Sequence, residues 1–277
     1  MILSERYGKI ETIARYPLGH LLKGTVLEKN ENHFIKMLTP PITLPEELYQ
    51  ELFNNLEEES RTIRKMRSSK ILRCLYHERE IDALLIGFPF PENPPLSLFI
   101  RENHPLSPEL VLSLLDQMSS IFSLLFSREI HRFQLEPELL FITPQNHKIV
   151  YVDTGMVNLA KNPETIRLGY LDGKPQFLPP ELLKSGELGV SSDVYFFAAF
   201  AHYLLTGKLH GQNLSPVTEA TLTITESLSP ANRFRDEREA RLNRWLARAS
   251  AQKPENRMKT VEEFFDGLRD ILSPGKK

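Results

Sequence analysis

Residues 127–142 read Ser-Arg-Glu-Ile-His-Arg-Phe-Gln-Leu-Glu-Pro-Glu-Leu-Leu-Phe-Ile. The stretch changes from polar to apolar, and its end opens a short apolar run, residues 139–143, that is typical of a strand. A Pro-Gln-Asn-His turn and a second run, residues 148–153, follow. Two such runs around a turn predict a β-hairpin that directly follows a polar loop.

Helical patterns surround this hairpin. Ser107 and Pro108 suit the N-cap and first position of a helix, and apolar residues follow at helical spacing. Residues 194–205 are apolar almost all round and end before Gly207, which predicts a helix in the middle of a core. Thr260 and Glu263 form a capping box before a final amphipathic helix. The aromatic residues of this part are expected in the core: Phe196, Phe197, Trp245, Phe264 and Phe265.

The first third of the chain is richer in strand patterns. Residues 24–28 and 33–38 flank a polar turn and predict a hairpin, and residues 71–75 and 82–88 predict two more strands. Between them, residues 46–67 carry apolar side chains at helical spacing. Glu59 lies on that apolar stripe, where a carboxylate is costly unless it is paired, so it requires a buried cation.

Four prolines at positions 89, 91, 94 and 95 form the clearest break in the chain. We therefore expect an α+β protein with two lobes. The small β-rich N-lobe covers residues 1–88, the linker residues 89–95, and the larger helical C-lobe residues 96–277.

Composition is that of an ordinary soluble globular protein. The 277 residues are 41% hydrophobic and 25% charged, with a net charge of -2. This charge favours neither nucleic acid nor anionic membranes as partners, and Arg61, Arg64, Lys65 and Arg67 are expected on the solvated side of a helix. Cys74 is the only cysteine, so no internal disulfide is expected. No signal peptide or membrane-spanning run is expected either, which favours a cytoplasmic location.

Residues 127–142 resemble the catalytic loop of the protein kinase family, S-R-G-I-V-H-R-D-L-K-P-E-N-I-L-I. Residues 173–181 look like the G-T-P-x-Y-L-A-P-E segment, residues 192–209 like S-D-V-Y-S-L-G to L-L-T-G-K-L, and residues 254–257 like P-E-x-R. The resemblance therefore covers nearly the whole chain and implies a two-lobed protein kinase-like fold. It also implies that Glu181 pairs with Arg257 and that Asp193 anchors the backbone of the catalytic loop.

The resemblance places Gln134 at the catalytic base and Leu139 at the metal-binding asparagine. A glutamine does not accept a proton at neutral pH, and leucine has no lone pair for a magnesium ion. Reading His131-Arg132 as the start of H-R-D instead places Phe133 at the base, and His131 is then an ordinary packed or surface histidine. Both registers lack the acid, and general-base assistance is worth roughly 10²–10⁴ in rate. Glu136 and Glu138 are weak candidates for a replacement base.

Part of the nucleotide site is kept. Residues 33–36 resemble V-A-I-K, which places Lys36 at the phosphate-binding lysine and Glu59 at its helix partner. Residues 152–155 resemble D-F-G, so Asp153 is a candidate ligand for one magnesium ion, with a structural cap on the following turn as the alternative. Ile86 is expected beside the adenine.

Other positions of the nucleotide site are changed. Ala14 and Tyr16 replace glycines of the G-x-G-x-x-G loop, which leaves Gly19 alone. Phe34 replaces the small residue above adenine and is expected to fill the pocket itself. Glu136 replaces a lysine aimed at the transferred phosphate and would repel ATP.

These replacements lead us to expect a pseudokinase that binds protein partners as a scaffold or allosteric regulator and does not act as an enzyme. The alternative is weak phosphoryl or nucleotidyl transfer from ATP and magnesium through Lys36, Glu59 and Asp153. A third reading is a domain that binds ATP without turning it over. No nucleic acid or membrane partner is expected.

Overall fold

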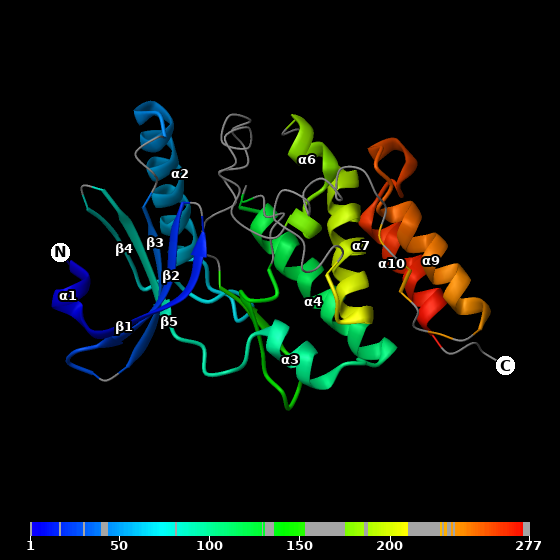
Figure 1. The fold of residues 1–277 in the computed structure, drawn as a ribbon, viewed down its shortest axis with the longest axis horizontal. Coiled ribbons are helices and arrows are strands. Elements are labelled where there is room, and N and C mark those ends of the chain that lie inside the picture. Colours follow the sequence, from blue (N-terminus) through cyan, green and yellow to red (C-terminus); the bar gives the residue numbers. More distant parts are fainter. Residues whose placement is uncertain are drawn as a thin grey trace. The chain divides into compact units, whose positions relative to one another are not determined.

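The computed structural model describes residues 2–16, 18–29, 31–39, 44–80, 82–128, 130, 136–152, 175–185, 188–209, 228, 230–231, 234 and 236–273. The chain divides into two compact units (Figure 1). The first, here called the sheet unit, contains the described residues of Met1–Pro95, Ile121–Pro144 and Ile149–Gly173. The second, the helical unit, contains those of Leu96–Ser120, Gln145–Lys148 and Lys174–Lys277.

The sheet unit is built on a five-stranded antiparallel sheet with the order β1-β2-β3-β5-β4 (Figure 1). Its strands are β1 (Tyr7–Tyr16), β2 (Gly19–Val26), β3 (Asn32–Leu38), β4 (Tyr76–Arg79) and β5 (Leu84–Pro89). The predicted hairpin around residues 29–32 is confirmed as β2 and β3. Neither β1 nor the short helix before it, α1 (Ile2–Arg6), was predicted from the sequence.

One face of the sheet carries an apolar cluster of its own. Tyr7, Leu22 and Ile35 are buried there, and Leu3 of α1 packs against them. The hydroxyl of Tyr7 lies 2.5 Å from that of Tyr76 and 2.8 Å from Nδ1 of His33. These bonds connect β1, β3 and β4 on one face of the sheet.

Arg6 adds a charged contact to the same face. Its guanidinium donates to Glu78 at 2.6 Å and lies 4.3 Å from the centre of the Tyr76 ring. Burial raises the pKa of Tyr76, so its hydroxyl stays protonated and continues to hydrogen-bond. The apolar cluster on this face of the sheet is therefore accompanied by hydrogen bonds and an ion pair between the strands.

Helix α2 (Glu46–Lys65) confirms the amphipathic pattern of residues 46–67 and ends two residues earlier. Its buried face consists of Leu48, Leu52, Phe53, Leu56, Glu59, Ser60 and Ile63. The prediction that Glu59 lies on the buried stripe is confirmed, because this side chain is only 4% exposed.

One strand prediction was wrong. Residues 71–75 form no strand of the sheet; Ile71 makes a single isolated bridge to Tyr151, and β4 begins at Tyr76. Ile71 and Cys74 are nevertheless buried. The apolar pattern of this segment reflects side chains that pack into the core. An apolar run alone does not form a strand when no neighbouring strand pairs with its backbone.

The predicted hairpin after the polar loop is confirmed. Strands β6 (Leu140–Ile142) and β7 (Ile149–Tyr151) pair in antiparallel fashion. Leu72 donates its backbone N–H to Tyr151, and Ile142 donates to Pro94. The hairpin is thus hydrogen-bonded to other segments of the sheet unit.

Most of the remaining elements belong to the helical unit (Figure 1). They are α3 (Leu96–Asn103), α4 (Pro108–Phe126, in this unit up to Ser120), η2 (Pro175–Phe177), α6 (Pro180–Ser185), α7 (Val190–Thr206), α9 (Glu237–Ala249), η3 (Pro254–Asn256) and α10 (Val261–Leu272). The expected fold, a β-rich N-lobe and a helical C-lobe, is confirmed. The lobe boundary at residues 89–95 stays a prediction.

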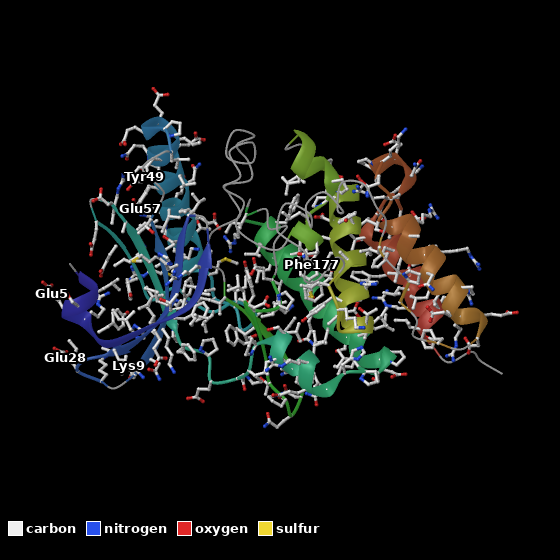
Figure 2. All side chains as sticks on the ribbon, in the orientation of Figure 1. Glu5, Lys9, Glu28, Tyr49, Glu57 and Phe177 are labelled. Atoms are coloured by element: carbon white, nitrogen blue, oxygen red, sulfur yellow. The ribbon has the colours of Figure 1, made fainter. Side chains whose placement is uncertain are left out.

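Helix α7 lies in the core of the helical unit, as its apolar sequence predicts. Phe177 of η2, labelled in Figure 2, packs on Phe196, Phe200 and Tyr203 of this helix. Glu5, Lys9 and Glu28, also labelled in Figure 2, lie instead at the rim of the sheet unit. The expected core positions of Phe196, Phe197, Phe264 and Phe265 are confirmed, whereas Trp245 is only partly buried.

The predicted helix ends are also present. The Ser107 hydroxyl accepts the N–H of Leu110, and Thr260 accepts the N–H of Glu263. The carboxylate of Glu263 accepts from Lys259. Gly207 ends α7 in the left-handed conformation, φ 68°.

Helix α4 is, within the described residues, the one helix long and apolar enough to span a membrane. A core helix of a soluble protein has the same composition, so this is weak evidence. Val111, Leu114, Leu115, Met118 and Ile121 are each 0% exposed, which accounts for the apolar face by packing.

Candidate functional site

Lys36 and Glu59 are both buried in the sheet unit, 1% and 4% exposed. Lys36 lies on β3 opposite Ile86 of β5, and Glu59 lies in the second half of α2. A charged side chain is costly to bury without compensation. The sheet and the helix therefore each bury one charged side chain, and the predicted role of the two groups in a nucleotide site stays a prediction.

Phe34 lies two residues before Lys36 on the same strand and is 2% exposed. Its ring meets that of Phe141 edge to face, with centroids 5.9 Å apart and an interplanar angle of 88°. On another side it contacts Phe90, with ring centroids 6.0 Å apart. The phenyl ring therefore packs on the chain's own aromatic side chains.

Phe141 and Phe90 were not singled out from the sequence. Phe141 was part of the apolar run of the hairpin, and Phe90 was part of the proline-rich break. Their contact with Phe34 depends on β3, β6 and the segment after β5 coming together in space. Neither residue carries a local signal for that contact.

Leu139 and Glu136 precede β6 and are both buried, 5% and 6% exposed. The N–H of Leu139 donates to the carbonyl of Glu136 at 2.9 Å, and its own carbonyl accepts from Val152 at 2.9 Å. Leu139 is thus a packed apolar residue with a fixed backbone. Its side chain offers no ligand atom to a cation.

Gly19 lies where β2 passes close to β3. Its φ is 151°, and an added Cβ would lie 2.0 Å from the carbonyl oxygen of Met37. Strands β1 and β2 remain paired up to Tyr16 and Gly19. The close packing of β2 against β3 therefore explains why residue 19 is a glycine, and no bound phosphate is needed to explain it.

We expect Gly19→Ala to lower the free energy of unfolding by about 2 kcal/mol, because the added methyl group displaces backbone and the left-handed φ is strained. Gly8→Ala in the neighbouring strand is the control, since its Cβ meets only the exposed side chain of Leu27. Urea unfolding measures both variants. Equal midpoints for the two would contradict the packing explanation.

Ile86 is 2% exposed and lies on β5 between its ladder partners Lys36 and His77. Its expected place beside adenine is untested. Within the described residues, no three His, Cys, Asp or Glu side chains form a metal-binding group.

Several predicted site residues lie outside the described part of the chain. They are His131, Phe133, Gln134 and Asp153. The loss of the catalytic base at Gln134 or Phe133 therefore stays a prediction, and so does the binding of magnesium by Asp153.

In the helical unit, Glu181 and Arg257 form the predicted ion pair. Two guanidinium nitrogens of Arg257 donate to the two carboxylate oxygens of Glu181, each at 2.7 Å. The Ser192 hydroxyl also donates to Glu181 at 2.7 Å. Burial acts to raise the pKa of Glu181, but the hydrogen bonds from Arg257 and Ser192 outweigh it, and the pKa is lowered.

Arg257 itself is 3% exposed and connects further segments. It donates to the carbonyl oxygens of Ser191 and Ala251 at 2.9 and 2.8 Å and lies 5.0 Å from the centre of the Tyr195 ring. One side chain thereby joins α6, α7 and the segment around η3.

Asp193 lies in the first turn of α7, and burial raises its pKa to about 6 from the ordinary 3.8. The resemblance implies that it anchors the backbone of the catalytic loop, but residues 131–135 are outside the described part. Hydrogen bonds from backbone amides would lower its pKa, so a titration of Asp193 would distinguish the two environments.

We expect the wild-type protein to lose stability relative to Asp193→Asn as pH rises from about 4 to above 6. The raised pKa means that the folded state prefers the neutral carboxyl group of Asp193. The stability that this preference contributes is fully present below the unfolded-state pKa of 3.8 and is lost as pH rises through the folded-state pKa of about 6. The loss is roughly 3 kcal/mol. Parallel urea titrations of the two proteins measure the difference, and a difference that grows in favour of wild type with pH would instead indicate amide donors.

The geometry described so far is that of a two-lobed kinase fold with a buried lysine, a buried glutamate and a buried Leu139. Residues 18–266 match the protein kinase domain family. The chain therefore belongs to the protein kinase family.

Curated relatives are bacterial kinases. The chain is 25% identical to the serine/threonine-protein kinase pkn3 of Myxococcus xanthus over 237 residues, 78% of this chain and 43% of that protein. It is 23% identical to Pkn1 of the same organism over 269 residues, 95% of this chain and 38% of that protein. The chain thus matches only about two fifths of each relative's length.

Solved kinase structures have the same fold. The Mycobacterium tuberculosis PknI kinase domain matches with a TM-score of 0.63 and 16% identity, covering 96% of this chain and 97% of that one. Rad53 residues 1–466 in complex with AMP-PNP match with a TM-score of 0.67 and 12% identity, covering 95% of this chain and 64% of that one. At these identities the likeness shows the fold alone.

Proposed function

We propose that this chain is a pseudokinase, a protein kinase-like domain that regulates or scaffolds a protein partner by binding it. The observation that carries the proposal is the edge-to-face contact of Phe34 with Phe141. The resemblance puts adenine directly beneath residue 34. A ring packed on the chain's own aromatic residues does not leave that space to a nucleotide.

The groups that would hold magnesium and phosphate support the same proposal. Leu139 is buried and apolar, and Gly19 is explained by its close approach to Met37. Glu136 adds a negative charge where the resemblance implies a phosphate-directed lysine. These residues do not fit ATP and magnesium, so we derive no phosphoryl-transfer step. We extend the proposal to a cytoplasmic location for this kinase-like domain.

The test is nucleotide binding and transfer by the purified chain. We expect no rise in melting temperature with ATP and magnesium, whereas a ligand at about 100 times its dissociation constant adds roughly 2.7 kcal/mol. We also expect no transfer of radiolabelled phosphate to the chain or to casein. Robust transfer that Asp153→Ala abolishes would overturn the proposal.

One observation favours a second candidate, weak transfer from a nucleotide. Lys36 and Glu59 remain buried on β3 and α2, as a functional pair would. A melting shift with ATP that Lys36→Met removes, together with weak transfer of labelled phosphate, would support this function instead. A shift without any transfer would identify a domain that binds ATP as a regulatory ligand.

A further inference from the structure

The 18 residues between Glu59 and Glu78 contain no aspartate or glutamate. They carry six lysine and arginine residues: Arg61, Arg64, Lys65, Arg67, Lys70 and Arg73. The whole chain has a net charge of -2. This segment, which runs from the end of α2 to the start of β4 in Figure 1, is therefore a concentrated positive region in a slightly acidic protein.

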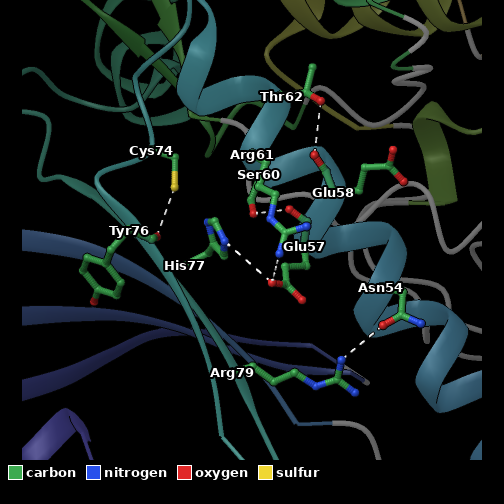
Figure 3. Close-up of polar contacts among 10 residues, drawn as sticks. All are labelled: Asn54, Glu57, Glu58, Ser60, Arg61, Thr62, Cys74, Tyr76, His77 and Arg79. Atoms are coloured by element: carbon green, nitrogen blue, oxygen red, sulfur yellow. Dashed lines mark hydrogen bonds and ion pairs between the residues drawn. The ribbon is translucent and has the colours of Figure 1, made fainter.

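A role in stabilising helix α2 explains the positions of only three of these six cationic residues. Arg61 is ion-paired with Glu57 at 2.5 Å, as Figure 3 shows. Arg64 and Lys65 occupy the last turn of α2, where cations offset the helix dipole. Arg67, Lys70 and Arg73 lie beyond the helix, so neither explanation applies to them.

These three residues, here called the basic ridge, are exposed. None of them forms an ion pair with any residue that the structure describes. Glu57, a carboxylate of the α2 surface, is already engaged by Arg61 and lies 3.8 Å from His77 (Figure 3). Within the part of the chain that the structure describes, no carboxylate therefore neutralises the ridge.

The backbone of the ridge is held in place. Buried side chains lie between the cations along the segment: Met66, Ile71 and Cys74 are 8%, 5% and 1% exposed. The carbonyl of Lys70 accepts the N–H of Tyr151 at 2.9 Å, and Leu72 donates back to Tyr151 at 2.8 Å. The cations recur every third residue on a fixed segment, so little backbone ordering is required when a partner binds.

An apolar side chain adjoins the ridge. Leu75 is 38% exposed, two residues after Arg73, and its N–H donates to Gly87 at 2.8 Å. The surface therefore offers a short row of charges followed by one fixed apolar group.

We propose that the basic ridge and Leu75 bind an acidic segment of a partner protein that carries an apolar residue beside its carboxylates. Charge complementarity supplies the attraction and the association rate, and the apolar contact adds orientation. Duplex nucleic acid and anionic membranes suit the site less, because they attract broad basic faces and the chain as a whole is acidic. The inference does not depend on the proposed function, since such a surface would recruit a partner or a substrate equally well.

Fluorescence anisotropy with a fluorescein-labelled glutamate-rich peptide containing a central leucine tests the proposal. We expect saturable binding that weakens as salt increases. The triple variant Arg67→Gln, Lys70→Gln, Arg73→Gln is expected to bind roughly tenfold more weakly. Leu75→Ser should weaken binding without changing its dependence on salt.

The control is Arg241→Gln, Arg244→Gln, Arg248→Gln on α9, which removes the same net charge from another exposed surface. Equal loss in this control would overturn the proposal, as would absence of binding or equal affinity for single-stranded DNA or phosphatidylserine vesicles. Ser69→Glu, which adds a carboxylate within the ridge, provides a second variant and should also weaken binding. All variants are compared only after their thermal melts match wild type, and none of these residues belongs to the nucleotide site.

Discussion

Arg257→Ala is expected to lower the free energy of unfolding by about 3–5 kcal/mol, the range for a buried ion pair that loses one partner. The guanidinium is almost fully buried and makes hydrogen bonds to Glu181 and to two backbone carbonyls. Its removal takes the cation away from the carboxylate of Glu181, while the hydrogen bond from the Ser192 hydroxyl remains. Urea unfolding followed by circular dichroism measures the change.

Arg241→Ala is the matched control. Arg241 pairs with Asp270 at 2.5 Å, but both side chains are about half exposed or more, 48% and 73%. An exposed pair contributes at most about 1 kcal/mol. Equal destabilisation by the two variants would show that burial does not set the strength of the Arg257 contacts.

Phe34→Ala has two expected effects of opposite sign. Loss of the buried ring lowers the free energy of unfolding by about 3–5 kcal/mol, because its contacts with Phe141 and Phe90 disappear. The resulting apolar cavity lies where the kinase resemblance places adenine. We therefore expect adenosine or ATP to raise the melting temperature of the variant and to leave that of wild type unchanged.

Phe126→Ala is the control for the loss of a phenyl group, because Phe126 is 64% exposed. It should change stability by less than about 0.5 kcal/mol and should confer no nucleotide response. A nucleotide response of wild type equal to that of Phe34→Ala would mean that the ring does not block the site. A destabilised Phe34→Ala protein without any response would place adenine binding elsewhere or exclude it.

Local signals predicted the two hairpins, β5 and the helices α2, α4, α7 and α10, but not β1, β4, α3, α6 or α9. Periodic apolar residues located α2 with Glu59 on its buried stripe, and Ser107, Gly207 and Thr260 marked helix ends. The ion pair of Glu181 with Arg257 followed from the kinase resemblance rather than from any local pattern. Motif spacing over nearly the whole chain gave the family correctly.

What could not be predicted depends on contacts between distant segments. The apolar pattern of Ile71 and Cys74 arises from packing and was mistaken for a strand. The meeting of Phe34 with Phe141 joins positions 107 residues apart, so periodicity carries no information about it. Arg67 was assigned to the solvated face of a helix, whereas α2 ends before it.

The hydroxyl contact between Tyr7 and Tyr76 links the two edge strands of the sheet. These residues belong to β1 and β4, the two edges of the order β1-β2-β3-β5-β4, and neighbouring strands lie about 4.8 Å apart. In a flat sheet the two edges would be separated by roughly four such spacings, about 19 Å. The two phenols cover this distance by lying across the sheet, because a Cβ added to Gly24 of β2 would lie 2.7 Å from the Tyr7 ring and one added to Gly87 of β5 would lie 2.1 Å from the Tyr76 ring. Glycines on two of the intervening strands thus leave room for a side-chain bridge between the opposite edges.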